Sequence, residues 1–116
     1  MPTERPPGDM KIGDLRRRVV LQKRTVTEDT LWQQTENWTD YAYVWAAVEP
    51  LSGREYFAAR QENAEVTARI IIRYRNDVSP RDTRVLLGNR VFDVVTVINP
   101  KEKNELLILM CREVSV

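Results

Sequence analysis

The stretch of sequence that decides the fold runs from residue 38 to residue 55 and reads Trp38-Thr-Asp-Tyr-Ala-Tyr-Val-Trp-Ala-Ala-Val-Glu-Pro-Leu-Ser-Gly-Arg-Glu55. Aromatic and small apolar residues fill its first half and predict a strand over Tyr41–Glu49. Both faces of this strand are apolar, so we expect it to be central, covered on both sides, with Trp45 in the core. Pro50 cannot donate to a ladder and ends the strand.

The second half of the same stretch carries the start of a helix. Ser52 and Glu55 stand three residues apart and form a capping box, in which each side chain satisfies a backbone N–H that the first turn leaves open. A modest apolar stripe that includes Phe57 follows. These signals predict a short α-helix over Gly53–Asn63.

Outside this stretch, five segments have the alternation or the β-branched content of strands. They are Arg18–Val26, Glu65–Tyr74, Thr83–Leu87, Arg90–Ile98 and Glu105–Arg112. The polar segment Thr27–Asn37 is interpreted as a loop, and Gly88-Asn89 as a hairpin turn. The fold class is therefore mainly β: a small antiparallel β-barrel of about six strands with one short α-helix between strands 2 and 3. We expect the four strands that follow the helix to form a meander.

The segment Glu65–Tyr74 alternates most clearly. Ile70 and Ile72 fall on one face with other apolar residues, and Arg69 and Arg73 fall on the opposite face. The pattern predicts a half-buried strand with a basic outer face, which continues to Arg75.

The length of 116 residues suits one domain with a core of limited size. Residues 1–9 are rich in proline and are expected to be a flexible N-terminal arm, followed by a single domain over residues 10–116. Eighteen basic and 17 acidic residues leave a net charge of +1, which gives no global field for nucleic acid or acidic membranes. No apolar segment of about 18 residues predicts a membrane span. We expect synthesis in the cytoplasm.

The residue types exclude most catalytic and metal chemistry. The chain has no histidine, which excludes histidine bases, catalytic triads and most zinc sites. Its one cysteine, Cys111, lies in an apolar run and is interpreted as a buried small hydrophobe. Glycines are scattered, so no phosphate-binding loop is present. The nearest carboxylate pair, Glu28-Asp29, is interpreted as solvated surface. We predict no catalytic residues, no metal site and no cofactor.

Arginines and tryptophans are the candidates for contacts with partners. Arg69, Arg73 and Arg75, like the Arg16-Arg17-Arg18 cluster, could contact phosphates or acidic side chains of a neighbour. The near-neutral net charge instead favours a soluble strand face that blunts edge pairing. Trp32, in the polar segment, is typical of an interface anchor, although packing onto its own domain is an equal alternative.

Several segments, taken in order, carry a resemblance to a known family. They are Ile12-Gly13-Asp14-Leu15-Arg16, Val44-Trp45-Ala46, Pro50-Leu51-Ser52-Gly53-Arg54-Glu55, Arg73-Tyr74-Arg75 and Leu107-Ile108-Leu109. In this order and spacing, the chain resembles the small head–tail joining proteins of tailed phages, also called head-closure or head–tail adaptor proteins. One departure is that Leu31-Trp32 stand in a loop where members of that family carry a glycine.

The resemblance implies a structural, non-catalytic β-barrel encoded by a phage or prophage and located at the virion neck. It implies a homo-oligomeric ring, monomeric when free, between the portal (connector) protein and a tail-completion protein, with packaged double-stranded DNA passing through without sequence specificity. No membrane partner is implied. The residues expected to make subunit or partner contacts are Arg16, Arg17, Leu31, Trp32, Arg54, Tyr56, Arg60, Arg69, Arg73 and Arg75.

Two alternatives from other classes stay open. An OB-like nucleic-acid-binding module predicts aromatics and arginines interleaved on one exposed face, together with salt-dependent binding. The segment Glu65–Tyr74 places its arginines opposite its tyrosine, which counts against this alternative. An enzyme that uses carboxylates alone predicts convergent acids in a pocket, and the sequence offers no such cluster.

Overall fold

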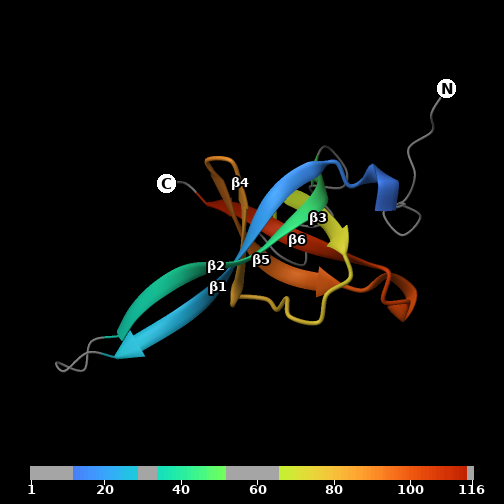
Figure 1. Ribbon diagram of the computed structural model, residues 1–116. Helices are drawn as coiled ribbons and strands as arrows, with labels where there is room; N and C mark the ends of the chain where they lie inside the picture. The colour runs from blue at the N-terminus through green and yellow to red at the C-terminus, as the bar shows by residue number, and fades with distance from the viewer. Residues whose placement is uncertain (1–11, 29–33, 52–65, 115–116) are drawn as a thin grey trace.

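The computed structural model describes residues 12–28, 34–51 and 66–114, and Figure 1 shows their arrangement. Its elements, in chain order, are a 3₁₀ turn η2 (Ile12–Asp14), strands β1 (Arg17–Glu28), β2 (Gln34–Pro50), β3 (Ala68–Arg73), β4 (Thr83–Leu87) and β5 (Arg90–Ile98), a 3₁₀ turn η3 (Pro100–Glu102) and strand β6 (Leu106–Val114). The helix predicted over Gly53–Asn63 lies outside the described residues.

The six strands close into an antiparallel barrel with the order β1-β2-β3-β6-β5-β4, and β4 pairs with β1. This confirms the predicted fold class. The expected four-strand meander is wrong in one respect, because β3 pairs with β6 and does not pair with β4. Tyr41 in β2 and Val95 in β5 have no partner residue in the strand pairing, so each marks a β-bulge. Bulges bend strands, and a barrel needs bent strands in order to close.

The interior of the barrel holds one apolar cluster, to which every strand contributes. Its fully buried members include Val19 and Leu21 from β1, Phe92 from β5 and Leu109 from β6. Val19, Leu21 and Phe92 alternate along their strands with exposed or half-buried residues, as a period of two requires. Cys111 is also fully buried in this cluster, which confirms its prediction as a small core residue.

A second, smaller cluster lies on the opposite side of β3 and β6 from the main core. It joins Leu15, Ile71, Leu106 and Ile108. Because Ile70 and Ile72 point into the barrel, Ile71 between them points outward, yet its side chain is fully buried. The prediction of a half-buried β3 with a basic outer face is therefore wrong at its centre, where this cluster covers the strand.

The hairpin of β1 and β2 is longer than the sequence indicates, and Figure 1 shows it projecting from the barrel. The two strands pair along their length, from Arg17 opposite Ala46 to Glu28 opposite Gln34. The loop predicted over Thr27–Asn37 is therefore wrong at both ends. The strand predicted over Tyr41–Glu49 is likewise only part of β2.

The remaining turns agree with the prediction from sequence. Gly88 and Asn89 connect β4 to β5, and Gly88 adopts a φ of +60°, which favours glycine. The turn expected after β5 contains η3, where Asn99 Oδ1 accepts a hydrogen bond from the backbone N–H of Asn104 at 3.1 Å. Among the described residues, no helix is long and apolar enough to span a membrane.

Candidate functional site

Two aromatic side chains stand in solvent on the outer face of β2. Tyr43 is 60% exposed and Trp45 is 53% exposed. They share this face because residues two apart on a strand point the same way, while the intervening Val44 is half-buried against the core. The expectation that β2 is covered on both sides, with Trp45 in the core, is wrong. Large exposed aromatics side by side are typical of a surface that contacts another molecule.

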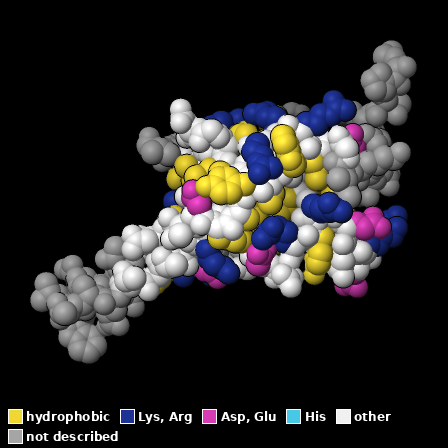
Figure 2. Space-filling view, viewed as in Figure 1, with side chains coloured by type: hydrophobic (Ala, Val, Ile, Leu, Met, Phe, Trp, Pro, Cys, Tyr) yellow, Lys and Arg dark blue, Asp and Glu magenta, His cyan; other side chains and the backbone are white. Residues whose placement is uncertain are grey.

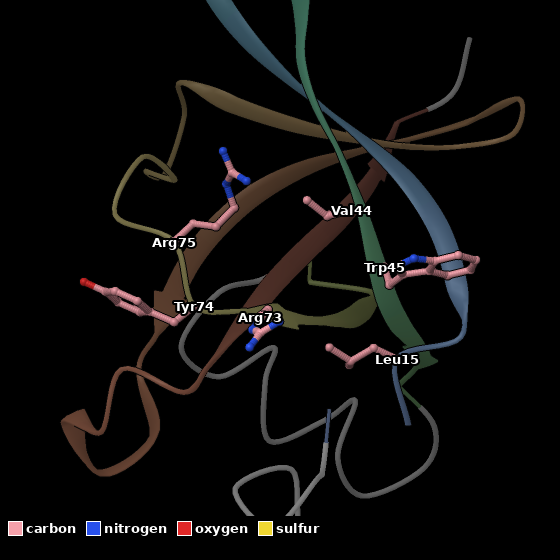
Figure 3. Close-up of a pocket in the computed structure, with 6 residues that line it drawn as sticks. All are labelled: Leu15, Val44, Trp45, Arg73, Tyr74 and Arg75. Atoms are coloured by element: carbon pink, nitrogen blue, oxygen red, sulfur yellow. The ribbon is translucent and has the colours of Figure 1, made fainter. Parts of the chain in front are cut away.

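A groove lies beside Trp45 at the point where β2 and β3 separate. β2 pairs with β3 only from Ala46↔Ile72 to Pro50↔Ala68, so β2 has no described strand on this side before Ala46. The groove has a volume of about 300 Å³ and is lined by Leu15, Val44, Trp45, Arg73, Tyr74 and Arg75. We call it the Trp45 groove. In Figure 3, Leu15 and Trp45 lie on one side, Tyr74 and Arg75 lie across from them, and Arg73 lies between.

The Trp45 groove combines apolar walls with positive charge. The guanidinium carbon of Arg18 lies 5.2 Å from the centre of the Trp45 ring, a cation–π contact. Arg73 is exposed and makes no ion pair with any residue that the structure describes. Among the residues that the structure describes, those that line the groove include no aspartate or glutamate. Figure 2 shows one face of the molecule, on which basic side chains lie among exposed hydrophobic ones, with acidic side chains also present.

Arg75 at the far wall is already engaged. Its Nε and Nη2 donate to the two carboxylate oxygens of Asp77 at 2.9 and 2.7 Å, and its guanidinium carbon lies 5.9 Å from the Tyr41 ring. The hydrogen bonds from Arg75 lower the pKa of Asp77 below its ordinary value. The Tyr41 hydroxyl donates to the backbone carbonyl of Asp77 at 2.9 Å, which fastens this segment to β2. Arg75 therefore shapes the groove, while Arg73 remains available.

A second groove, lined by residues of β2, β4, β5 and β6 together with Arg81, differs in its electrostatics. It has a volume of about 400 Å³ and is lined by Glu36, Trp38, Arg81, Arg84, Asp93, Val94, Val95 and Arg112. Arg84 stacks on the Trp38 ring at 4.2 Å from its centre, and Asp93 accepts hydrogen bonds from both Arg84 and Arg112. Its charges are largely paired internally, so it has less to offer a partner than the Trp45 groove.

The structure brings together only part of the predicted contact set. Arg73 and Arg75 line the Trp45 groove. β3 ends at Arg73, however, so Arg75 does not extend a basic strand face. Arg69 is held by Glu49 on β2 at 3.0 Å. Arg16 and Arg17 are exposed at the start of β1, where Arg16 Nε donates to the Gly13 carbonyl at 3.4 Å. The predicted contact residues outside the described ranges are Leu31, Trp32, Arg54, Tyr56 and Arg60.

Sequence reasoning missed the exposed aromatic residues at and beside the groove. Tyr43 and Trp45 were not among the expected contacts, although they share a face by their spacing, and Arg18 was considered only as part of the Arg16-Arg17-Arg18 cluster. The available signal was the register of β1 and β2, which sets Arg18 opposite Trp45. That register is visible only once the strands are paired.

Among the described residues, no group of three or more histidine, cysteine, aspartate or glutamate side chains is placed to hold a metal ion. Cys111 is fully buried, and burial raises the pKa of its thiol, so it is not a ready nucleophile. The surface features that remain are the exposed aromatics and arginines of the Trp45 groove, which suit recognition of another molecule.

A sequence model of the family described as "Phage head completion protein" matches residues 10–114. Head completion protein gp7 of Enterobacteria phage HK97 is 32% identical over 96 residues, which cover 82% of this chain and 86% of that protein.

Two solved structures share the fold. The solution structure of protein SF1141 from Shigella flexneri 2a is 33% identical, covers 90% of this chain and 96% of its own, and has a TM-score of 0.73. A chain from the virion of a native gene transfer agent particle is 21% identical, covers 88% of this chain and 97% of its own, and has a TM-score of 0.57. At that identity the second likeness shows the fold alone. The match over nearly the whole chain shows that this protein belongs to the phage head completion protein family.

Proposed function

We propose that this chain is the non-catalytic adaptor that joins the portal vertex of a DNA-filled phage or prophage head to the tail. The observation that carries the proposal is the family match over residues 10–114. The closed barrel supports it, because side chains fill its interior. In this proposal, the protein acts through surfaces that bind neighbouring proteins of the virion.

The partners of such an adaptor are the portal (connector) protein on one side and a tail-completion protein on the other. The protein forms a homo-oligomeric ring at the virion neck after synthesis as a monomer in the bacterial cytoplasm, and packaged double-stranded DNA passes through the ring without sequence-specific contacts. Closed rings are built from heterologous interfaces, in which two different patches of the same chain meet. The Trp45 groove is one such patch, and residues 1–9 form an arm that reaches a neighbour.

The experiment that tests the proposal is electron microscopy of particles from a host in which the gene has been deleted. We expect full heads without tails, or heads that have lost their DNA, and recovery of tailed particles when the gene is supplied on a plasmid. Normal tailed particles from the deletion strain would contradict the joining role.

A second candidate function, non-specific nucleic-acid binding, is favoured by one observation. Arg18 stacks on the exposed Trp45 next to Tyr43, so aromatics and arginines do interleave on one face, as a base-stacking surface requires. A gel-shift titration with single- and double-stranded DNA tests it. Binding at low salt that weakens steeply with added salt and is lost in Trp45→Ala would support this function, and no shift at low salt would exclude it.

A further inference from the structure

A row of apolar side chains crosses the outer face of the barrel from β2 to β6. Successive cross-strand pairs join Tyr43, Val20, Leu86, Val91 and Val114. Because Val19, Val85 and Phe92 beside them point into the core, these residues point outward. We call them the Tyr43 row.

The Tyr43 row keeps apolar surface in contact with solvent. Tyr43 is 60% exposed, and the four aliphatic members are half-buried. The row crosses from β2 to β6 by four strand spacings of about 4.8 Å, so it extends about 19 Å around the barrel. Trp45, which is 53% exposed, widens its β2 end. A continuous apolar row of this length, unlike a single exposed side chain, is typical of a surface that packs against another protein.

Hydrogen-bonded polar side chains border the row on the side toward the outer hairpin. On β4, β5 and β6 this border consists of Arg84, Asp93 and Arg112, and Asp93 accepts hydrogen bonds from both arginines. On β1, Gln22 donates to Asp40 at 2.6 Å. A polar border around an apolar centre is the usual composition of a protein–protein interface. Nucleic acid fits this border less well, because its phosphates would compete with Asp93 for both arginines.

The β2 end of the row carries an exposed positive charge. Arg18 is exposed, and its guanidinium carbon lies 5.2 Å from the centre of the Trp45 ring. Figure 3 shows this ring lying over β1, the strand that carries Arg18. A guanidinium that a partner covers loses water and needs acceptors in return, which a carboxylate supplies best. A partner that fits the row therefore places an acidic side chain at this end.

The Tyr43 row and the Trp45 groove lie on different sides of Trp45. The groove lies between β2 and Arg73–Arg75, whereas the row runs from β2 over β1 to β4. Two neighbours can therefore occupy them at the same time. In the proposed ring, the groove serves the contact between copies, which leaves the row for a different protein.

We propose that the Tyr43 row is the surface by which this protein holds a different virion protein. That partner presents apolar side chains along about 19 Å, the length of the row, and a carboxylate that pairs with Arg18 at its β2 end. The inference rests on the proposed function and deepens it, because it assigns a surface and a chemistry to the joining contact.

Matched substitutions in the full-length protein test the row. Leu86→Asp introduces a charge at its centre and Leu86→Met keeps it apolar, while Arg18→Glu reverses the charge at its end and Arg18→Lys keeps it. Each variant is supplied to the gene-deleted phage, and infectious particles are counted. We expect Leu86→Asp and Arg18→Glu to reduce the titre by about tenfold or more and the two conservative variants to stay near the parent. A full titre with Leu86→Asp would overturn the proposal.

Photocrosslinking identifies the occupant even if a charged variant fails to fold, which circular dichroism detects. A photoreactive phenylalanine analogue replaces Tyr43 or, separately, Val91, and particles containing ¹⁵N-labelled and unlabelled chains are irradiated and digested. Crosslinks from both positions to one other virion protein, at a segment with apolar and acidic residues, support the proposal. Crosslinks only to another copy of this chain or to DNA, or none at all, overturn it.

The gene deletion separates this inference from the proposed function. Normal tailed particles from the deletion strain would mean that the joining function itself is wrong. Heads without tails in that strain, together with a full titre for folded Leu86→Asp, would leave the joining function intact and exclude only the Tyr43 row as its surface.

Discussion

Asp93 on β5 is the acid that two arginines from neighbouring strands share. Arg84 and Arg112 donate to its two oxygens at 2.9 and 2.8 Å, and its side chain is 25% exposed. Asp93→Asn keeps the size of the side chain but removes the charge, and it leaves two guanidinium groups close together. We expect the free energy of unfolding, measured by urea titration, to fall by about 1–2 kcal/mol, because hydrogen bonds to charged groups exceed neutral ones and screening is only partial here.

The matched control for Asp93 is Glu113→Gln. Glu113 also holds an arginine by two hydrogen bonds, to Arg90, but the two side chains are 39% and 51% exposed. Water screens such a pair and takes the place of either partner, so we expect little or no change in stability. Equal losses in the two variants would show that burial of Asp93 contributes nothing.

Asp77 gives the fold a specific sensitivity to acid. The hydrogen bonds from Arg75 lower its pKa in the folded state below the unfolded value of about 3.9. The carboxylate therefore stabilises the fold at pH values above the unfolded pKa, and this contribution is lost as the pH falls through the folded-state pKa. We expect Asp77→Asn to be less stable than the parent at pH 7 and to lose less stability on acidification.

Urea titrations of both proteins at pH 7 and in acid measure this difference. Asparagine retains the backbone carbonyl that accepts the Tyr41 hydroxyl, so the comparison isolates the carboxylate. The explanation would be wrong if the stability of the variant and the parent declined by the same amount on acidification.

Single residues also show the limit of what sequence predicts. Cys111 was placed correctly because it sits in an apolar run. Trp45 was placed wrongly because both faces of β2 are apolar near it. Which face the barrel covers depends on the strands and turns that pack there, and no local pattern records this.

At the scale of elements, the strands inside the barrel were predicted with nearly correct bounds. The bounds of β4 and β5 agree with the predicted Thr83–Leu87 and Arg90–Ile98. The β1–β2 hairpin was truncated in the prediction, because its outer part is polar on both faces. A strand that leaves the barrel buries neither face, so its sequence loses the alternation by which strands are detected.

The same argument predicts that the outer part of the hairpin is dispensable for folding. Thr25 and Asn37 are opposite each other, so replacing residues 26–36 with Asn-Gly closes the hairpin with a two-residue turn. The deleted segment pairs only with itself among the described strands. We expect the shortened chain to fold with a Tm within about 5 °C of the intact protein, because little buried surface is lost.

A core truncation provides the reference for this deletion. Leu21 lies on the same hairpin but points into the barrel and is fully buried. We expect Leu21→Ala to cost about 2–5 kcal/mol, far more than removal of the whole outer hairpin. Thermal unfolding followed by circular dichroism measures both variants. A shortened chain that failed to fold, or that was less stable than Leu21→Ala, would contradict the independence of the barrel from its hairpin.

At the scale of the whole molecule, closure into a barrel was predictable but the strand order was not. Consecutive strands usually pair, and β1 with β2, β2 with β3, β4 with β5 and β5 with β6 do so. The exceptions are that β3 pairs with β6 and not with β4, and that β4 closes onto β1. These long-range pairings depend on the path of the chain between β2 and β3 and on bulges at Tyr41 and Val95, which composition and alternation do not reveal.

The closed arrangement predicts an uneven distribution of stability over the molecule. β3 lies between β2 and β6, and its residues Ile70, Ile71 and Ile72 are fully buried on alternate sides by the two apolar clusters. Their amides open only with global unfolding, whereas those near Thr25 lie on a ribbon outside the barrel and open locally. We expect hydrogen exchange, followed by NMR on dilute monomer, to be slowest in β3 and at least about a hundredfold faster in the outer hairpin.

Hydrogen exchange must be measured at low protein concentration, because only then does it report on a single copy of the protein. Dilution removes any contacts between copies, so protection of the outer hairpin then reports only on its own barrel. Slow exchange near Thr25 in dilute protein, comparable with that of Ile71, would show that the hairpin is an integral part of the barrel. Fast exchange near Thr25, with slow exchange in β3, is the result expected of a stable barrel from which the hairpin projects.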